Sequence, residues 1–213
     1  MSSFPSLRLA WCSREAARFA VDSWHYSHNL PAGKLNTVGV WECGSFIGAV
    51  VFSLGCGLST MGKRYGLAER FEMAELSRVA LNGHKTPVSR ILSIACRMAK
   101  KENPGLRMLI SFADPYQGHV GIIYQAAGWF YTGRYEDNKG TFVINGTPIH
   151  SKSAGQRYGA GGQGIEWLRA HIDPHAYRIL KPKHRYLLPL DNEMQGRIAK
   201  LMQPYPKRAG SSD

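Results

Sequence analysis

The feature that most constrains the fold is an amphipathic helix expected between two apolar strands near the middle of the chain. Its apolar residues recur at helical spacing: Val88, Ile91, Leu92, Ala95, Met98 and Ala99. Thr86 is expected to cap this helix, Pro87 to take its first position, and a Pro-Gly pair at 104–105 to end it. Because strands are expected at 72–81 and 107–113, this unit predicts an α/β protein.

Shorter elements are expected on both sides of this unit. Those before it are a strand at 7–11, a helix after the N-cap Ser13, a hairpin of 37–42 with 46–54, and a glycine-spaced loop at 55–66. Those after it are a helix at 119–127, a strand at 129–135, a hairpin near 141–149, a glycine-rich basic loop at 151–164, a helix at 165–171, a strand at 185–190 and a C-terminal amphipathic helix.

This order predicts a mixed sheet flanked by helices, with an added basic loop and helix region toward the C-terminus. It is the element order of the GNAT acyltransferase fold, so a GNAT-like α/β class is expected rather than a doubly wound sheet. The chain shows no internal repeat and no interdomain linker. We therefore expect a single domain over 1–203 and a flexible tail over 204–213.

The excess of basic over acidic residues predicts a polyanionic partner. Lys and Arg number 27 against 15 Asp and Glu, a formal net charge of +12. Clustered cations bind phosphates because they release condensed counterions. A basic protein that is merely soluble is the alternative. The residues assigned to contacts with double-stranded DNA are Lys34, Lys63, Arg64, Tyr116, Lys152, Arg157, Tyr158, Lys181, Lys183 and Arg185.

The cysteines Cys12, Cys43, Cys56 and Cys96 form no CxxC pair, so neither a zinc site nor a disulfide framework is expected. No segment has the apolar run of a signal peptide or the length of a membrane span. We therefore expect a cytoplasmic protein with no membrane partner. The sequence leaves a monomer and a homodimer both open.

Several segments carry a more specific pattern. They are Trp24-His25-Tyr26-Ser27 with Gly33-Lys34-Leu35, Glu75-Leu76-Ser77-Arg78-Val79-Ala80-Leu81 through Thr86-Pro87-Val88-Ser89-Arg90, Ser111-Phe112-Ala113-Asp114-Pro115-Tyr116-Gln117-Gly118-His119 through Ile123-Tyr124-Gln125-Ala126-Ala127-Gly128-Trp129, and Lys183-His184-Arg185-Tyr186. Together, over roughly residues 7–190, they resemble the bacteriophage Mom family, which modifies adenines in phage DNA.

The resemblance implies a GNAT-like enzyme that adds a carbamoylmethyl group to the exocyclic amine of adenine in duplex DNA. The product shields the DNA from restriction endonucleases. The resemblance also implies the use of acetyl-CoA and a requirement for iron. A phage-encoded chain would work in the cytoplasm of the host cell.

GNAT proteins hold CoA along a splayed central strand, with its pyrophosphate at the N-terminus of the next helix, where amides and the helix dipole favour an anion. The residues assigned to this cofactor are Arg78, Val79, Leu81, Lys85, Thr86, Val88, Ser89 and Arg90. The loop at 82–85 lacks the glycine-rich signature of acyltransferases. An ordinary capped helix is therefore the alternative.

Two candidate catalytic residues follow the strand at 107–113. Tyr124 falls where many GNAT enzymes keep a tyrosine acid, and a phenol can give its proton to a leaving group. Asp114, with Tyr116, lies where an open sheet places its ligands, and these residues could orient an adenine amine and stack on a flipped base. The alternatives are a core tyrosine and a plain turn.

Three further candidates are His25, Tyr26 and Glu75. Strand alternation places Glu75 and Arg78 on opposite faces, which makes Glu75 a candidate base or metal ligand rather than a partner of Arg78. His25, Glu75 and Asp114 are plausible iron ligands, because imidazole with carboxylates suits ferrous iron. The alternatives are a histidine that positions the flipped base and a salt bridge from Glu75 to another residue.

The sequence thus predicts a DNA adenine-modifying transferase. A conventional GNAT N-acetyltransferase of a protein or small molecule would bind CoA without DNA. A non-catalytic DNA-binding protein would bind DNA without changing its mass. The excess of positive charge argues against the first alternative, and the polar residues at strand ends argue against the second.

Overall fold

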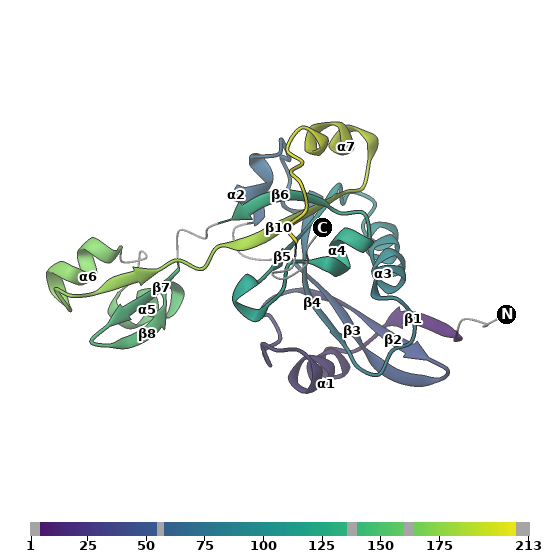
Figure 1. The fold of residues 1–213 in the computed structure, drawn as a ribbon, viewed down its shortest axis with the longest axis horizontal. Helices are drawn as coiled ribbons and strands as arrows, with labels where there is room; N and C mark the ends of the chain where they lie inside the picture. The colour runs from purple at the N-terminus through teal and green to yellow at the C-terminus, as the bar shows by residue number, and fades with distance from the viewer. Residues whose placement is uncertain (1–4, 55–57, 136–139, 160–163, 208–213) are drawn as a thin grey trace. The chain divides into compact units, whose positions relative to one another are not determined.

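The computed structural model describes residues 5–54, 58–135, 140–159 and 164–207. The chain forms two compact units (Figure 1). The core unit consists of residues 1–113, 120–133 and 185–213, and the insert unit of residues 114–119 and 134–184. The expectation of one domain over 1–203 stays a prediction. The boundaries at 133/134 and 184/185 fall inside two strands rather than in a linker, so composition does not reveal them.

A seven-stranded sheet in the order β1-β2-β3-β4-β5-β10-β6 is the framework of the core unit. The strands are β1 (Leu7–Trp11), β2 (Leu35–Glu42), β3 (Ser45–Ser53), β4 (Met73–Leu81), β5 (Met108–Ala113), β6 (Phe130–Tyr135) and β10 (Lys183–Pro189). The helices are α1 (Arg14–Trp24), α2 (Leu58–Lys63), α3 (Val88–Glu102), α4 (Ile122–Ala126) and α7 (Asn192–Ala199), with a 3-10 turn η1 (Arg70–Glu72). Strands β1 to β4 are antiparallel neighbours and β4 pairs with β5 in parallel, which confirms the mixed sheet flanked by helices.

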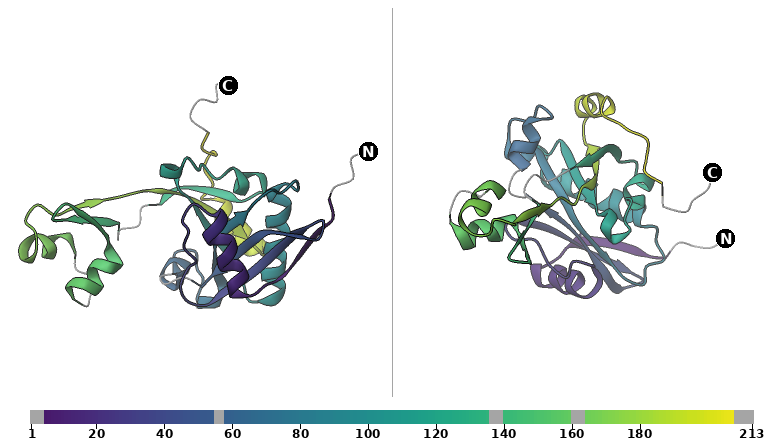
Figure 2. Two further views of the ribbon diagram at one scale, coloured as in Figure 1. Left: turned by 90° about the horizontal axis from the view of Figure 1, so that it is seen from below. Right: turned by 60° about the vertical axis from the view of Figure 1, so that its left-hand side comes forward.

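Helices cover both faces of this sheet (Figure 2). In β3, Val50 and Phe52 pack in the hydrophobic cluster that contains α3, whereas Ala49 and Val51 pack in the cluster with α1. Successive strand side chains point to opposite faces, so burial on both sides requires an apolar run without polar alternation. This requirement explains the sequence of β3, which is apolar from residue 46 to residue 52.

A bulge in β4 changes the expected faces of two candidate residues. The register with β3 shifts so that Val51 faces Arg78 and Phe52 faces Leu76, leaving Ser77 as the extra residue. Leu76 therefore packs in the hydrophobic cluster that contains α3, and Ala80 packs in the cluster that contains α1. Without the bulge, these two residues would lie on one face of the sheet, because they are an even number of positions apart. The prediction that Glu75 and Arg78 lie on opposite faces is wrong, because the bulge interrupts the alternation.

The insert unit has its own small sheet and core. Its strands β7 (Thr141–Ile144), β8 (Thr147–His150) and β9 (Tyr177–Ile179) pair in the order β8-β7-β9. It also holds the 3-10 turn η2 (Pro115–Gln117) and the helices α5 (Ser151–Tyr158) and α6 (Ile165–His171). The basic loop expected at 151–164 is thus a helix over its first half, because Ala154 is buried against Phe142 and Leu168. Residues 160–163 of that predicted loop lie outside the described residues.

Two residues of the predicted tail, Tyr205 and Pro206, make hydrogen bonds within the core unit. The Tyr205 hydroxyl donates to the backbone oxygen of Trp129 at 2.9 Å, and the Gln125 amide donates to that of Pro206 at 3.3 Å. The segment is therefore held against α4 and the start of β6. Residues 208–213 lie outside the described part of the chain.

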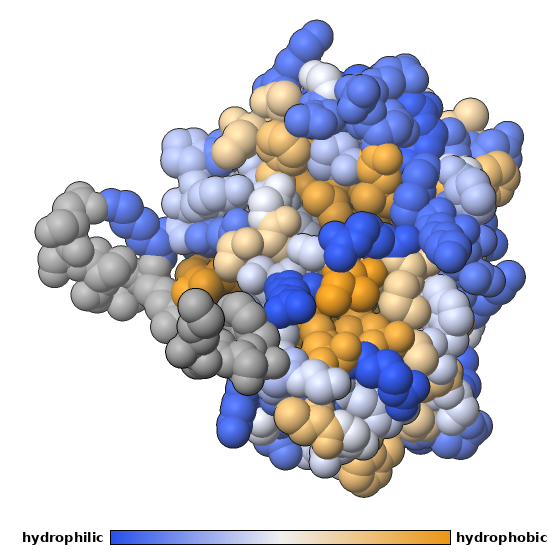
Figure 3. All heavy atoms as spheres, turned by 90° about the vertical axis from the view of Figure 1, so that its right-hand side faces the viewer, coloured by the Kyte–Doolittle hydropathy of each residue, from blue (hydrophilic) through white to orange (hydrophobic). Residues whose placement is uncertain are grey.

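The positive net charge does not make every face hydrophilic. On the face seen in Figure 3, hydrophobic side chains reach the surface between hydrophilic ones. Among the described residues, no helix combines the length and the apolar character needed to cross a membrane.

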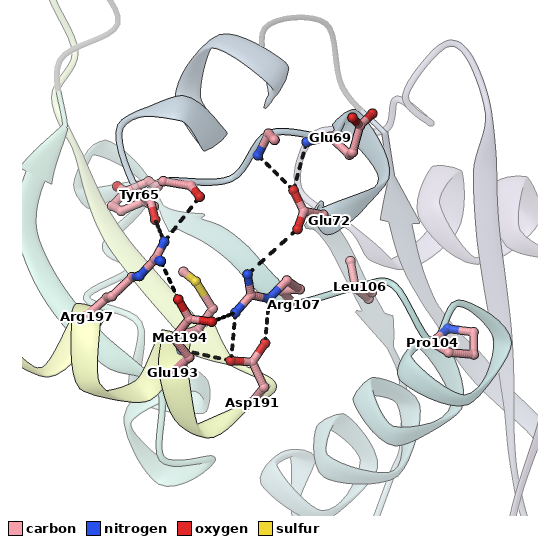
Figure 4. A network of polar contacts seen from close by, with 12 residues as sticks. Tyr65, Glu69, Glu72, Pro104, Leu106, Arg107, Asp191, Glu193, Met194 and Arg197 are labelled. Atoms are coloured by element: carbon pink, nitrogen blue, oxygen red, sulfur yellow. Dashed lines mark hydrogen bonds and ion pairs between the residues drawn. The ribbon is translucent and has the colours of Figure 1, made fainter.

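An ion-pair network joins the start of β5 to α7 and to η1 (Figure 4). The Arg107 guanidinium contacts Asp191 at 2.8 Å, Glu193 at 2.7 Å and Glu72 at 3.8 Å. Glu193 also pairs with Arg197, which donates to the backbone oxygens of Tyr65 and Gly66 at 3.1 Å. The network thus stabilises the end of the sheet at which β5 begins.

Acid should weaken this network. The Arg107 guanidinium lowers the pKa of the Asp191 and Glu193 carboxyls below their ordinary values. Groups with a depressed folded-state pKa stabilise the fold above the unfolded-state pKa, and this contribution is lost as the pH falls through the folded-state pKa. The free energy of unfolding in urea should therefore decrease as the pH falls below about 5, and Arg107→Met should flatten this decrease. An unchanged slope in the variant would contradict the prediction.

Candidate active site

The site begins where two neighbouring strands part. Strands β4 and β5 pair only at Met73–Met108, Ala74–Leu109 and Glu75–Ile110, although β4 continues to Leu81 and β5 to Ala113. Backbone groups beyond the last pair must find other partners, because unpaired buried groups are costly. We call this opening between β4 and β5 the fork.

Ser111 and Tyr124 occupy the fork. The Ser111 Oγ lies 2.7 Å from the backbone oxygen of Leu76, just beyond the last strand pair, and 2.7 Å from the Tyr124 hydroxyl. A serine hydroxyl has one proton, and a carbonyl oxygen only accepts. Ser111 therefore donates to Leu76, and Tyr124 donates to Ser111. Both side chains are buried, so this chain of hydrogen bonds holds the phenol in place.

The environment of Tyr124 keeps its hydroxyl protonated. Burial is the main cause that raises the pKa of Tyr124 to about 12; the Ser111 hydrogen bond partly offsets it, and the nearby Tyr26 and Glu75 add to the rise. A phenol with this pKa is a proton donor at neutral pH and not a base. Because Tyr26 and Glu75 act on this pKa, the structure brings these predicted site residues to the same place.

His25 completes this group beside Tyr26, at the end of α1. The two rings lie with centroids 4.4 Å apart and an interplanar angle of 30°. The Ser27 backbone N–H donates to the His25 Nδ1 at 3.1 Å. A nitrogen that accepts carries no proton, so the neutral ring carries its proton on Nε2. The Ser27 Oγ also lies 2.9 Å from the His25 Nδ1, so Ser27 holds the ring by its Nδ1 edge.

The predicted iron site does not form. Within the part of the chain that the structure describes, no three or more His, Cys, Asp or Glu side chains gather as metal ligands. His25 has its Nδ1 engaged by Ser27, and Asp114 caps η2 by accepting from the Tyr116 N–H at 2.9 Å. The residues His25, Glu75 and Asp114 therefore do not fit iron, and we derive no step through a metal.

Asp114 and Tyr116 belong to the insert unit and form a cluster with two lysines. The Lys183 Nζ lies 3.9 Å from the Asp114 carboxylate, and the Lys181 Nζ lies 5.6 Å from the centroid of the Tyr116 ring. The Tyr116 side chain is 56% exposed, so it is available for stacking. The catalytic role of Asp114 stays a prediction, because the contacts seen here give it a structural role.

The residues expected to hold CoA have other partners in this structure. Val79, Leu81 and Val88 pack against the α3 cluster, and the Arg78 guanidinium donates to the backbone oxygen of Asn29 at 3.0 Å. Arg90 is exposed, and the Ser89 backbone oxygen accepts from the Ser93 hydroxyl at 2.8 Å.

The backbone N–H groups of Lys85 and Thr86 donate to the Glu42 carboxylate at 2.9 and 2.8 Å. The Thr86 hydroxyl also donates to Glu42, at 2.6 Å, so Thr86 does not cap α3 as predicted, and the cap position falls on Pro87. The loop before α3 thus does not fit the pyrophosphate of CoA, because a carboxylate already holds its amides.

Glu42 and Ser111 are the site residues that the sequence did not reveal. Glu42 is an acid that follows the apolar run 38–41 at the end of β2, which is a signal of a buried partner. Ser111 is a hydroxyl within an apolar strand, the same kind of signal.

The residues predicted to contact DNA differ in how far their side chains are exposed. Lys34, Lys63, Arg64, Arg157 and Lys181 are exposed, and Tyr158 lies under the Arg157 guanidinium at 5.6 Å. Arg185 is held within the sheet, donating to the Thr132 hydroxyl and backbone oxygen at 2.8 Å. Lys152 lies in α5, but its side chain is outside the described part.

Replacing Ser111 by alanine should test the hydrogen bonds at the fork. Ser111→Ala leaves the Leu76 carbonyl and the Tyr124 hydroxyl without this partner, so we expect a loss of about 1–3 kcal/mol in the free energy of unfolding. The Tyr124 pKa should rise further, because the Ser111 hydroxyl can no longer turn to donate to the phenolate, which is how it lowers this pKa. Absorbance titration of tyrosinate, with Tyr124→Phe to assign the signal, measures the shift. A fall in this pKa would contradict the geometry.

Comparisons with known proteins identify relatives of this chain. The family model of the Mom protein family matches residues 6–207. The methylcarbamoylase Mom of Escherichia phage Mu is 25% identical over 207 residues, covering 94% of this chain and 84% of that protein. A putative acetyltransferase from Acinetobacter baylyi has a TM-score of 0.49 at 12% identity, covering 90% of this chain and 96% of that one. An acetyltransferase from Bacillus subtilis in complex with CoA has a TM-score of 0.45 at 13% identity, covering 87% and 100%. The match of the family model over nearly the whole chain shows that this protein belongs to the Mom protein family.

Proposed function

We propose that this chain is a DNA-modifying transferase that adds a carbamoylmethyl group to the exocyclic amine of adenine in double-stranded DNA, which protects the DNA from restriction endonucleases. Membership of the Mom family supports a transferase, and the methylcarbamoylase Mom of phage Mu is a relative. The observation that carries the proposal is the buried, protonated Tyr124 at the fork, with Tyr26 and Glu75 close enough to affect its pKa.

The transfer needs two proton movements. A bond forms between the adenine amine nitrogen and the donor carbon, and the bond from that carbon to the leaving group breaks. The amine gives up one proton, which we assign to the Glu75 carboxylate, and the leaving group takes one, which we assign to Tyr124. The proton received by Glu75 then restores Tyr124, so the site returns to its starting state.

Tyr26 and His25 are suited to hold the adenine once it has left the stack. An amine within a base pair cannot be reached in duplex DNA, so the base must be flipped. Tyr26 is 45% exposed, and its ring could stack on the flipped base. The His25 Nε2–H could donate to a ring nitrogen of adenine. This arrangement supports binding of the base beside the fork.

Phosphate contacts are assigned to the exposed cations of both units. Lys34, Lys63 and Arg64 belong to the core unit, and Arg157 and Lys181 to the insert unit. Cations on the surface bind the DNA backbone without reading its sequence. Tyr116 adds an exposed ring in the insert unit.

The family resemblance implies the involvement of acetyl-CoA, although transfer of its acetyl group alone would leave an amide on the amine and would not supply the carbamoyl nitrogen. The residues present only partly fit this cofactor. The fork could receive the thioester arm, but the loop before α3 holds Glu42 in place of a pyrophosphate. No step above depends on CoA.

Removing the phenol should abolish modification without affecting DNA binding. Tyr124→Phe keeps the ring in the core and removes the proton, so we expect the modified adenine to fall at least about 100-fold, the usual contribution of a general acid. Mass analysis of nucleosides from plasmid DNA of expressing cells measures the product. Tyr135→Phe, which also removes one hydroxyl, is the matched control. Normal modification of DNA by the Tyr124→Phe variant would rule out this role. Unmodified DNA from cells that express the wild-type protein would rule out the proposed function.

DNA affinity should decrease steeply with salt, by roughly one unit of log–log slope for each phosphate contact. Replacing both Arg157 and Lys181 by alanine should reduce this slope by about two units, since both side chains are exposed. Lys100 and Lys101 of α3 offer a double alanine control with the same change in charge. Equal slopes in the two double variants would remove Arg157 and Lys181 from the interface.

A further inference from the structure

The loop between β4 and α3 holds an anion that belongs to the chain itself. Glu42, the last residue of β2, is only 7% exposed. Its Oε2 accepts from the Lys85 N–H at 2.9 Å, and its Oε1 accepts from the Thr86 N–H at 2.8 Å and from the Thr86 hydroxyl at 2.6 Å. The carboxylate thus uses both oxygens on this loop.

Glu42 stays charged in this position. The Thr86 hydroxyl and the Lys85 amide, by donating to it, hold its pKa below the ordinary value against the effect of burial, and His84 adds to the shift. The N-terminus of a helix favours a negative charge, because its first N–H groups and the helix dipole point toward it. The Lys85 and Thr86 amides that hold Glu42 directly precede the cap residue Pro87, so the carboxylate places a negative charge next to this end of the helix.

A diphosphate could not share this loop with Glu42. The amides of Lys85 and Thr86 already donate to the carboxylate, and a second anion at the same place would be repelled by it. Displacing Glu42 would leave a charged side chain buried without its hydrogen bonds, which is costly. The Glu42 carboxylate therefore already occupies the amides that a diphosphate would need.

We propose that Glu42 is a specificity-determining residue that closes the β4–α3 loop to diphosphates, so that the group donor is held without a diphosphate there. This role of Glu42 rests on the proposed transferase function only because it concerns the group donor. The closure itself is independent of which acceptor the protein modifies.

Binding of CoA and of inorganic pyrophosphate to the full-length protein tests the proposal, without DNA present. Calorimetry on the wild type should show a Kd for pyrophosphate no tighter than about 1 mM, a level that corresponds to weak binding. Glu42→Gln removes the charge and frees an amide, so its Kd for pyrophosphate should be at least about tenfold lower. Asp173→Asn is the matched control, because Asp173 is another buried carboxylate, which accepts from the Asn145 and His175 amides at 2.7 and 2.9 Å in the insert unit.

Hydrogen exchange at the Lys85 and Thr86 amides locates any binding. If CoA binds the wild type with micromolar affinity and changes exchange at these amides, the proposal is wrong. It is also wrong if folded Glu42→Gln gains no affinity over the Asp173→Asn control. If Glu42→Gln does not fold, the wild-type titration and exchange alone decide. Adenine modification is measured separately by nucleoside mass, so a failure of the DNA proposal leaves this result intact.

Discussion

The hydrogen bond from Ser111 to the Leu76 carbonyl is the interaction on which the candidate site depends. Strands β4 and β5 separate after Glu75 and Ile110, and a separation inside a buried sheet leaves backbone groups that need new partners. Ser111 donates to the Leu76 carbonyl oxygen, the first of these groups, and accepts a hydrogen bond from the Tyr124 hydroxyl. The geometry of the phenol thus follows from the way the sheet opens. Without the opening, Tyr124 would be an ordinary core side chain.

Much of the framework could be predicted from local pattern, because each helix or strand is specified by its own neighbours. The apolar stripe of α3, the hairpin of β2 and β3, and α6 were all predicted near their observed ranges. What could not be predicted depends on contacts between distant segments. The bulge at Ser77 is set by the register with β3, and the Glu42 contact joins residues more than 40 positions apart. The short strand β9 exists only because β7 offers an edge.

The candidate site shows the same division. Tyr124, Tyr26 and Glu75 were chosen from residue type and from the family resemblance, and the structure brings them together. The structure does not support the predicted iron site, for a reason that composition cannot reveal. Imidazole and carboxylate are good ligands, but Ser27 engages one nitrogen of His25, and η2 requires the Asp114 carboxylate as its cap. The chemistry available to a side chain thus depends on which of its atoms already form hydrogen bonds with the backbone.

The use of the acidic residues also explains how the net charge can serve DNA binding. The chain has 15 Asp and Glu, and the two that are buried in the described part of the chain, Glu42 and Asp173, bind backbone amides rather than cations. Glu42 accepts from Lys85 and Thr86, and Asp173 from Asn145 and His175. A carboxylate bound to amides in the interior stabilises loops and helix ends but pairs with no lysine or arginine at the surface. The exposed cations therefore remain available for the DNA partner proposed above, and Glu42 occupies the amides of the β4–α3 loop.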